Sequence, residues 1–220
     1  MSLENHETKE LFTIEKVTIK NKKKIGSGNW LEIDEVEYIE PITKAIRTWE
    51  VCKRKTDFVK KEVDAVDIHG IIHSPNLPPQ IVLIVQYRPP VERYCIEFPS
   101  GLIDQGETVE EAALRELQEE TGYIGKIKNI SDPICYEPGL TDSMTRIVDI
   151  EIDLSLEENI SPLQSLDGDE WSLKVIKLPL YNLFEELKGL QQKYNESLWI
   201  DSRLYSYAYG LNIAKSTKFN

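Results

Sequence analysis

The chain has 220 residues, with 38 Asp and Glu against 26 Lys and Arg, which gives a formal net charge of −12. Hydrophobic residues make up 40% and charged residues 29%, a globular composition for one or two domains rather than a disordered one. The acidic balance argues against broad nucleic-acid binding, and the longest apolar run, residues 81–85, is far too short to span a membrane.

The first part of the chain is expected to be a small antiparallel β domain, residues 1–56. Apolar and polar residues alternate over 12–19, as in a half-buried strand, and a turn is predicted at 22–28 from its lysines and glycines. Two further strands are predicted at 30–39 and 42–52. So small a sheet, with few large apolar residues, is expected to need a partner surface.

Residues 57–220 are expected to form a second domain, a mixed sheet with helices packed on it. Strands are predicted at residues 63–72, 81–87, 94–98, 145–154 and 172–178. The continuous apolar run at 81–87 indicates a central buried strand. Helices are predicted at residues 107–121, 180–194 and 201–215, with Gly122 after the first, Asp201 capping the last, and an acidic loop at 155–170.

The location expected from the sequence is the cytoplasm, with nuclear entry left open. Residues 1–10 are polar and acidic and contain no secretory signal pattern. Cys52, Cys95 and Cys135 lack the spacing of a disulfide framework or a zinc site and are predicted to be small core residues. His69 and His73 are predicted to be structural, because no third ligand accompanies them.

The predicted helix at 107–121 carries Glu116, Glu119 and Glu120 within an arc of roughly 100°. Like charges one turn apart repel by on the order of a few tenths of a kcal/mol, a cost that a divalent cation would turn into binding. Magnesium suits such a place because it favours carboxylate and phosphate oxygens. Arg115 can orient one of these carboxylates. Without its surroundings, however, such a cluster is more often a solvated acidic face.

An adjoining face of the same helix is expected to pack on the sheet. Its residues are Ala113, Leu114, Leu117 and Thr121. The helix is therefore predicted to place its carboxylates beside an apolar contact surface.

Fixed residues around the acidic cluster complete a long motif. Gly101, Glu107, Arg115, Glu116, Glu119, Glu120 and Gly122 fit the pattern G-x5-E-x7-R-E-U-x-E-E-x-G-U, where U is bulky and apolar and Tyr123 takes the last position. This stretch resembles the Nudix box. The resemblance implies a metal-dependent hydrolase with an α/β/α sandwich and two or three Mg²⁺ or Mn²⁺ ions per site. It also implies Glu116, Glu120 and the Ser100 carbonyl as metal ligands, with Glu119 as a third carboxylate ligand or an outer contact.

Outside the box, the chain is similar to the ADP-sugar (ADP-ribose) pyrophosphatase subgroup. The similarity lies in residues 47–50, 86–90, 94–101 and 137–140, with Pro138 at the spacing typical of this subgroup, and in residues 201–208. The resemblance implies substrate contacts from Trp30, Trp49, Glu50, Arg54, Arg88, Leu102 and Glu137. These side chains suit a nucleoside diphosphate sugar.

Each residue type fits its implied role. Trp30 and Trp49 could sandwich an adenine, since base stacking on an aromatic ring is worth about 1–3 kcal/mol. Arg54 and Arg88 could bind the diphosphate through paired hydrogen bonds. Glu50 and Glu137 could accept hydrogen bonds from adenine or ribose.

The acidic loop at 167–171 supplies the expected general base. The resemblance implies a glutamate here that activates the attacking water, which selects Glu170, with Asp167 and Asp169 as rivals. The glycine of the loop would let it close over bound substrate.

The function expected from the resemblance is hydrolysis of ADP-ribose to AMP and ribose 5-phosphate. The expected assembly is a homodimer with exchanged N-terminal domains, in which Trp49 of one chain serves the metal site of the other. One alternative is a Nudix enzyme for a UDP-sugar, an NAD-type dinucleotide or an oxidised nucleotide. The second alternative is a ligand-sensing Nudix domain without turnover.

Overall fold

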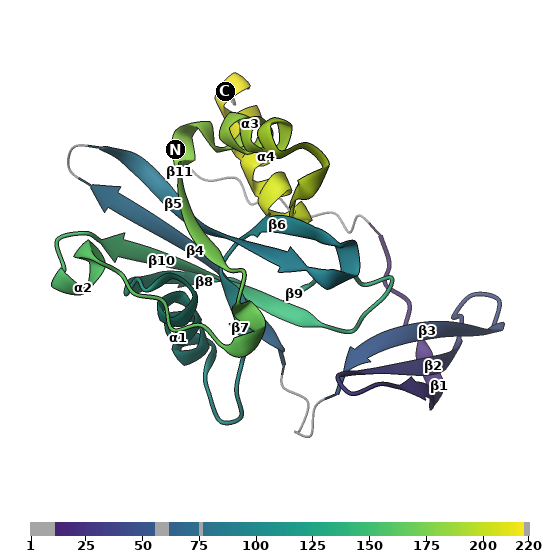
Figure 1. Cartoon of the computed structure of the whole chain (residues 1–220). Coiled ribbons are helices and arrows are strands. Elements are labelled where there is room, and N and C mark those ends of the chain that lie inside the picture. Colours follow the sequence, from purple (N-terminus) through teal and green to yellow (C-terminus); the bar gives the residue numbers. More distant parts are fainter. Residues whose placement is uncertain (1–11, 56–61, 75–76, 218–220) are drawn as a thin grey trace, which may run out of the picture. The chain divides into compact units, whose positions relative to one another are not determined.

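The computed structural model describes residues 12–55, 62–74 and 77–217 (Figure 1). These residues form two compact units. The first contains the described parts of Met1–Val59 together with Tyr136–Ser143, and the second contains those of Lys60–Cys135 and Met144–Asn220. The segment Tyr136–Ser143 was predicted to belong to the second domain, but it is part of the first unit.

The first unit is a three-stranded antiparallel sheet. Its strands are β1 (Thr18–Ser27), β2 (Leu31–Ile39) and β3 (Ile46–Arg54), in that order. The added segment pairs with β3, since the Cys52 amide donates to the Leu140 carbonyl at 2.8 Å and Trp49 Nε1 donates to the Gly139 carbonyl at 3.0 Å. A segment distant in sequence therefore completes this unit.

The prediction of a turn at 22–28 is wrong. Strand β1 runs through the lysines because their side chains pair across the sheet with acidic residues of β2, as in Lys24–Glu32 and in Lys20–Glu37 at 2.8 Å. The chain reverses only after Ser27, and β1 begins at Thr18, so most of the predicted strand at 12–19 lies before it.

The sheet of the first unit has no apolar core among its described residues. Asp34, paired with Lys53, is the one buried side chain among them. Many large apolar side chains are exposed: Ile19, Ile25, Trp30, Leu31, Ile33, Ile42, Ile46 and Trp49. This exposure agrees with the expectation that the sheet needs a partner surface.

The second unit is built on a mixed sheet in the order β12-β6-β5-β4-β10-β8. The strands of this path are β4 (Ala65–Ser74), β5 (Leu77–Arg88), β6 (Arg93–Glu97), β8 (Lys126–Ile130), β10 (Met144–Asp153) and β12 (Leu198–Ile200). Three more strands pair off this path: β7 (Ser100–Leu102) with β4, β9 (Ile134–Cys135) with β10 and β11 (Lys174–Pro179) with β5. Strand β5 pairs with β4, β6 and β11, so the predicted central strand is confirmed.

Helices cover both faces of this sheet (Figure 1). Helix α1 (Val109–Thr121) packs on one face through a core that includes Val66, Ile68 and Leu117. Helices α3 (Leu183–Tyr194) and α4 (Ser202–Ser216) pack on the other face through a second core, with Ile81, Leu83, Ile96, Leu183 and Leu204. The predicted α/β/α sandwich is confirmed.

Several smaller features differ from the expectations. Strands β7, β8, β9 and β12 were not predicted, and the predicted loop at 155–170 contains the short α2 (Glu157–Ile160) and a 3₁₀ turn at Gly168–Glu170. Cys95 is buried as predicted, but Cys52 is only partly buried, and the prediction that Cys135 is a core residue is wrong because its side chain is exposed. Over the described ranges, we find no helix with the length and apolar character of a membrane span.

Candidate active site

Helix α1 presents two of its glutamates to the protein interior. A capping box fixes its start, with the Glu111 amide donating to Thr108 Oγ1 at 3.2 Å and the Thr108 amide to the Glu111 carboxylate at 2.9 Å. It ends at Gly122, whose positive φ of 75° favours glycine. The side of the helix that faces the sheet thus buries Glu116 and Glu120, with 8% and 2% of their surfaces exposed.

The apolar side of α1 is slightly rotated from the prediction. Ala113, Leu117 and Thr121 are buried as expected, but Leu114 is exposed and Ala112 is buried in its place. The alternative of a solvated acidic face does not describe Glu116 and Glu120, because both lie next to this buried side.

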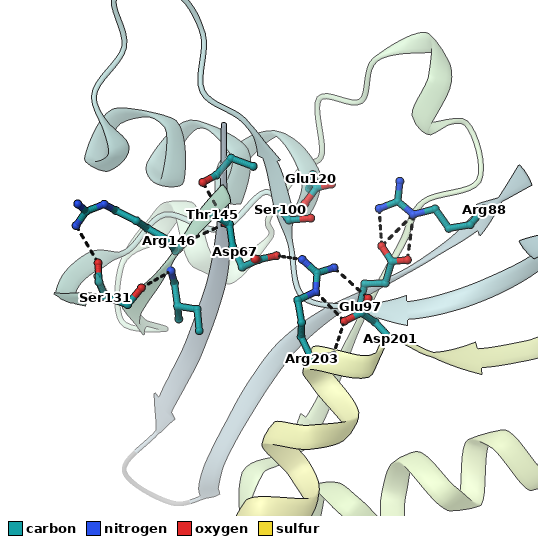
Figure 2. Close-up of polar contacts among 12 residues, drawn as sticks. Asp67, Arg88, Glu97, Ser100, Glu120, Ser131, Thr145, Arg146, Asp201 and Arg203 are labelled. Atoms are coloured by element: carbon teal, nitrogen blue, oxygen red, sulfur yellow. Dashed lines mark hydrogen bonds and ion pairs between the residues drawn. The ribbon is translucent and has the colours of Figure 1, made fainter. Parts of the chain in front are cut away.

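The loop before the helix holds both buried carboxylates. The Ser100 amide donates a hydrogen bond of 2.9 Å to Glu120 Oε2, and Figure 2 shows the two residues side by side. Glu116 lies against Gly101, where an added Cβ would come within 1.9 Å of the Glu116 Cδ. Only glycine leaves room for this carboxylate, so the glycine that begins the motif has a steric reason to be there.

Arg115 ties the acidic side chains of the motif together. Its guanidinium donates to Glu107 at 2.8 and 3.0 Å, to Glu116 at 2.8 Å, to Glu119 at 2.9 Å and to the Leu102 carbonyl at 2.9 Å. These carboxylates raise the pKa of Arg115, so it remains charged. Arg115 therefore orients Glu116, as predicted, and holds the more exposed Glu119 as well.

The two buried glutamates resist ionisation in the absence of a cation. Burial raises the pKa of Glu120 to about 9, with smaller contributions from the negative charges of Glu116 and Glu170, although the hydrogen bond from Ser100 opposes this shift. Burial also raises the pKa of Glu116, against the influence of Arg115. A nearby cation would favour the ionised form of both groups.

Glu170 belongs electrostatically to the same cluster. It ends the 3₁₀ turn Gly168–Glu170 and is partly buried, and its carboxylate accepts a hydrogen bond of 2.9 Å from the Asp167 amide. Its charge contributes to the raised pKa of both Glu116 and Glu120. The rival Asp167 is exposed, and the side chain of Asp169 lies outside the described parts of the structure.

Two predicted substrate contacts, Leu102 and Arg88, belong to the second unit. Leu102 is exposed at the end of β7, just after Ser100 and Gly101. Arg88 ends β5 and is paired with Glu97, and its positive charge lowers the pKa of Glu120 against the effect of burial. Glu97 was not among the predicted site residues, although a charged residue in the otherwise apolar strand at 94–98 is a signal that could have found it.

The other predicted substrate contacts belong to the first unit. Trp30 is 82% and Trp49 53% exposed, so both rings have accessible surface. Glu50 and Arg54 on β3 and Glu137 in the added segment are also exposed. The predicted base-stacking residues and the predicted metal ligands therefore come from different units.

The residues at Ser100 and α1 suit a magnesium-type ion. Their donors are carboxylate and main-chain oxygens, and a bound cation would offset the effect of burial and favour the ionised form of both carboxylates. Among the described residues, no three His, Cys, Asp or Glu side chains are grouped closely enough to hold a metal by themselves. The predicted set of two carboxylates and one main-chain oxygen leaves the other positions to water and phosphate oxygens.

Comparisons with known proteins agree with this site. A model described as NUDIX domain matches residues 66–177. The chain is 35% identical over 218 residues to the ADP-sugar pyrophosphatase of Mus musculus, covering 99% of this chain and 94% of that protein. It is 35% identical over 200 residues to the ADP-ribose pyrophosphatase of Saccharomyces cerevisiae, covering 90% of this chain and 84% of that protein.

A solved structure shares the fold. It is a crystal structure of an ADP compounds hydrolase, with a TM-score of 0.62 and 23% identity, covering 92% of this chain and 95% of that one. The match of the NUDIX model to the unit that carries the buried glutamates, and the near full-length similarity to the mouse protein, lead to one conclusion: this chain belongs to the Nudix family.

Proposed function

We propose that this protein hydrolyses the diphosphate bond of ADP-ribose and related ADP-sugars, giving AMP and ribose 5-phosphate from ADP-ribose. The observation that carries the proposal is the 35% identity, over 99% of this chain, to an ADP-sugar pyrophosphatase. The site agrees with it, since every carboxylate of the motif is present and Glu116 and Glu120 are buried together beside Ser100.

The metal ions would be held by Glu116, Glu120 and the carbonyl of Ser100. Nudix hydrolases generally depend on divalent metals, and such ions supply charge neutralisation on phosphate oxygens when they are bound. The choice between Mg²⁺ and Mn²⁺ and the number of ions remain predictions from the sequence, as does a cytoplasmic location.

The protein's own groups bind the substrate and move the proton. Arg88 hydrogen-bonds the diphosphate, whose negative charge matches the guanidinium. Glu170 takes a proton from the water whose oxygen attacks one phosphorus, while the bridging P–O bond breaks and its electrons go to the departing phosphate. Water thus adds across the diphosphate, and no oxidation or reduction takes place.

The nucleoside half of the substrate is recognised by the first unit. Trp30 and Trp49 stack on adenine through their exposed rings, while Arg54 contacts the diphosphate. Glu50 and Glu137 accept hydrogen bonds from adenine or ribose, and Leu102, of the second unit, packs against the substrate. The family resemblance suggests these roles, and the accessibility of the two rings supports them.

A homodimer with exchanged N-terminal domains is the second part of this proposal. The described sheet of the first unit has an exposed apolar surface and no core of its own, which supports association with another surface. Exchange of an identical element between two chains is a low-cost route to a dimer. In such a dimer, Trp49 of one chain serves Glu116 and Glu120 of the other.

Turnover of a substrate panel tests the function. Purified protein with Mg²⁺ is incubated separately with ADP-ribose, a UDP-sugar, NADH and an oxidised nucleoside triphosphate, and the products are identified by chromatography. We expect the highest kcat/KM with ADP-ribose and equal amounts of AMP and ribose 5-phosphate. Higher efficiency with another compound would select the first alternative above.

A variant at the predicted metal site shows whether the observed hydrolysis comes from this protein and not from a contaminating enzyme. Glu120→Gln removes a ligand charge and is expected to abolish turnover, whereas Glu110→Gln, in the exposed first turn of α1, keeps it. Binding of ADP-ribose by the wild-type protein without any hydrolysis would instead identify a sensing domain.

A further inference from the structure

Arg88 is held along one edge of its guanidinium by a single carboxylate. Its Nε lies 3.0 Å from both carboxylate oxygens of Glu97, and its Nη2 donates to Glu97 Oε2 as well (Figure 2). Within the described ranges, Arg88 Nη1 makes no hydrogen bond. One edge of the guanidinium is therefore fixed, and the other is left for a ligand.

Strand register explains how these two side chains meet. In the β5–β6 pair, Arg88 lies opposite Arg93 and Glu97 lies opposite Ile84, so the Arg88 side chain runs back along the strands to reach Glu97. Gln86, two residues before Arg88 on β5, donates a hydrogen bond of 3.4 Å to Glu97 Oε2. The carboxylate is thus contacted by two residues of β5.

Burial differs sharply between the two partners. The Glu97 side chain is 6% exposed and the Arg88 side chain 42%. A buried carboxylate needs a charge partner, since removing that partner would leave an uncompensated charge. Glu97 can therefore keep Arg88 in one orientation, while the Arg88 side chain stays partly accessible.

Glu97 lies three residues before Ser100 in the chain, and the Ser100 amide donates to Glu120 Oε2 at 2.9 Å. The segment that holds Arg88 therefore leads directly into the predicted metal site, where a bound diphosphate would lie. Within the described ranges, the Glu97 carboxylate accepts hydrogen bonds from Gln86 and Arg88 and makes none with Glu116 or Glu120.

We propose that Glu97 is a positioning residue that holds the Arg88 guanidinium with its free edge turned toward the diphosphate. This inference rests on the proposed function. Fixing a long side chain before the substrate arrives spares the entropy of ordering it on binding. Without Glu97, Arg88 keeps its charge but loses its orientation, so substrate binding weakens more than the chemical step.

A double-mutant cycle tests this role. Glu97→Gln keeps the shape and removes the charge, and we expect it to raise the KM for ADP-ribose about 10-fold with a smaller change in kcat. Arg88→Ala should raise KM further. If Glu97 acts through Arg88, then adding Glu97→Gln to Arg88→Ala causes no further rise. Effects that multiply in the double variant would overturn the proposal.

Three controls separate positioning from damage to the fold. Adenosine binding should be the same in all variants, since it does not involve the diphosphate. Glu151→Gln removes the acidic partner of an exposed ion pair, Lys128–Glu151 at 2.7 Å, and should leave KM unchanged. Should Glu97→Gln not fold, Arg88→Lys keeps the charge but not the planar fork; a wild-type KM in that variant would also overturn the proposal.

The proposed function and this inference fail in different ways. Absence of ADP-ribose turnover by the wild-type protein contradicts the function, and the cycle is then measured with whichever diphosphate compound of the panel is hydrolysed. Turnover of ADP-ribose with multiplying effects contradicts only the role of Glu97.

Discussion

The carboxyl group of Glu116 occupies the space next to Gly101 where any other residue would carry its side chain. A Cβ at this position would lie 1.9 Å from both Cδ and Oε1 of Glu116, far inside contact distance. A glycine in the loop and a glutamate in the helix are thus a matched pair, and the position of the carboxylate depends on the missing side chain.

Gly101→Ala is therefore expected to displace Glu116 and to lower kcat/KM by roughly 100-fold, the size of effect that a shift of about 1 Å can have on catalysis. Steady-state kinetics with ADP-ribose and Mg²⁺ measure it. Gly189→Ala is the matched control, because an added Cβ there meets nothing within 4 Å on helix α3. That control should keep full activity and gain about 0.5–1 kcal/mol of stability. A folded Gly101→Ala protein with wild-type kcat/KM would contradict the steric argument.

Glu170→Gln is expected to lower kcat by about 10²–10⁴-fold with little change in substrate affinity, because a positioned base acts on the water and not on binding. Single-turnover rates and the Kd of ADP-ribose separate the two effects. Asp167→Asn is the comparison, since Asp167 contributes its backbone amide to Glu170 and its own side chain is exposed. If Asp167→Asn or Asp169→Asn loses kcat while Glu170→Gln keeps it, the base has been assigned to the wrong residue.

Complementation tests the shared site. Trp49→Ala and Glu120→Gln are each expected to be poor enzymes, and the two are unfolded and refolded together in equal amounts. About half of the dimers are then mixed, and each mixed dimer has one intact site and one with both lesions, so roughly a quarter of all sites recover wild-type activity. If both residues serve a site within one chain, mixing yields only the average activity of the two variants.

His69 predicts a pH dependence of stability. It packs against Phe98 and Tyr207, at ring-centroid distances of 4.4 and 4.8 Å, and its Nδ1 is 3.1 Å from Asp149 Oδ1. Burial lowers the pKa of His69 below its ordinary value of 6.5, although Asp149 opposes the shift. The unfolded state therefore takes up the proton first, and the free energy of unfolding falls as the pH drops below about 6.5 toward the folded pKa.

Urea unfolding between pH 7.5 and 5 measures this effect. With His69→Gln, the free energy of unfolding should decrease less between pH 7.5 and 5 than it does in the wild-type protein. His73→Gln, at an exposed position of the same strand, should show the wild-type decrease. An unchanged pH dependence in the His69 variant would show that burial does not shift its pKa.

Local signals predicted the elements that hold the candidate site. Gly122 marks the end of α1, and the apolar run at 81–87 identifies β5. Features that depend on pairing were missed: Lys24 lies within β1, where it forms an ion pair with Glu32 of β2, and a single strand's sequence does not show its neighbour. The role of Glu97 likewise depends on the register of β5 and β6. Leu114 was misplaced because the helix turns a different side to the sheet than periodicity alone suggested.

The segment Tyr136–Ser143 makes the first unit discontinuous in the chain, and this limits how the protein can be taken apart. Cutting the chain after residue 56 would leave the carbonyl of Leu140 without the Cys52 amide and the carbonyl of Gly139 without Trp49 Nε1. The unit is therefore not a removable module. If β1, β2 and β3 are replaced by the strands of another protein, the segment Tyr136–Ser143 must be replaced by one that fits them. Mutations in these strands and in this segment are therefore constrained to occur together.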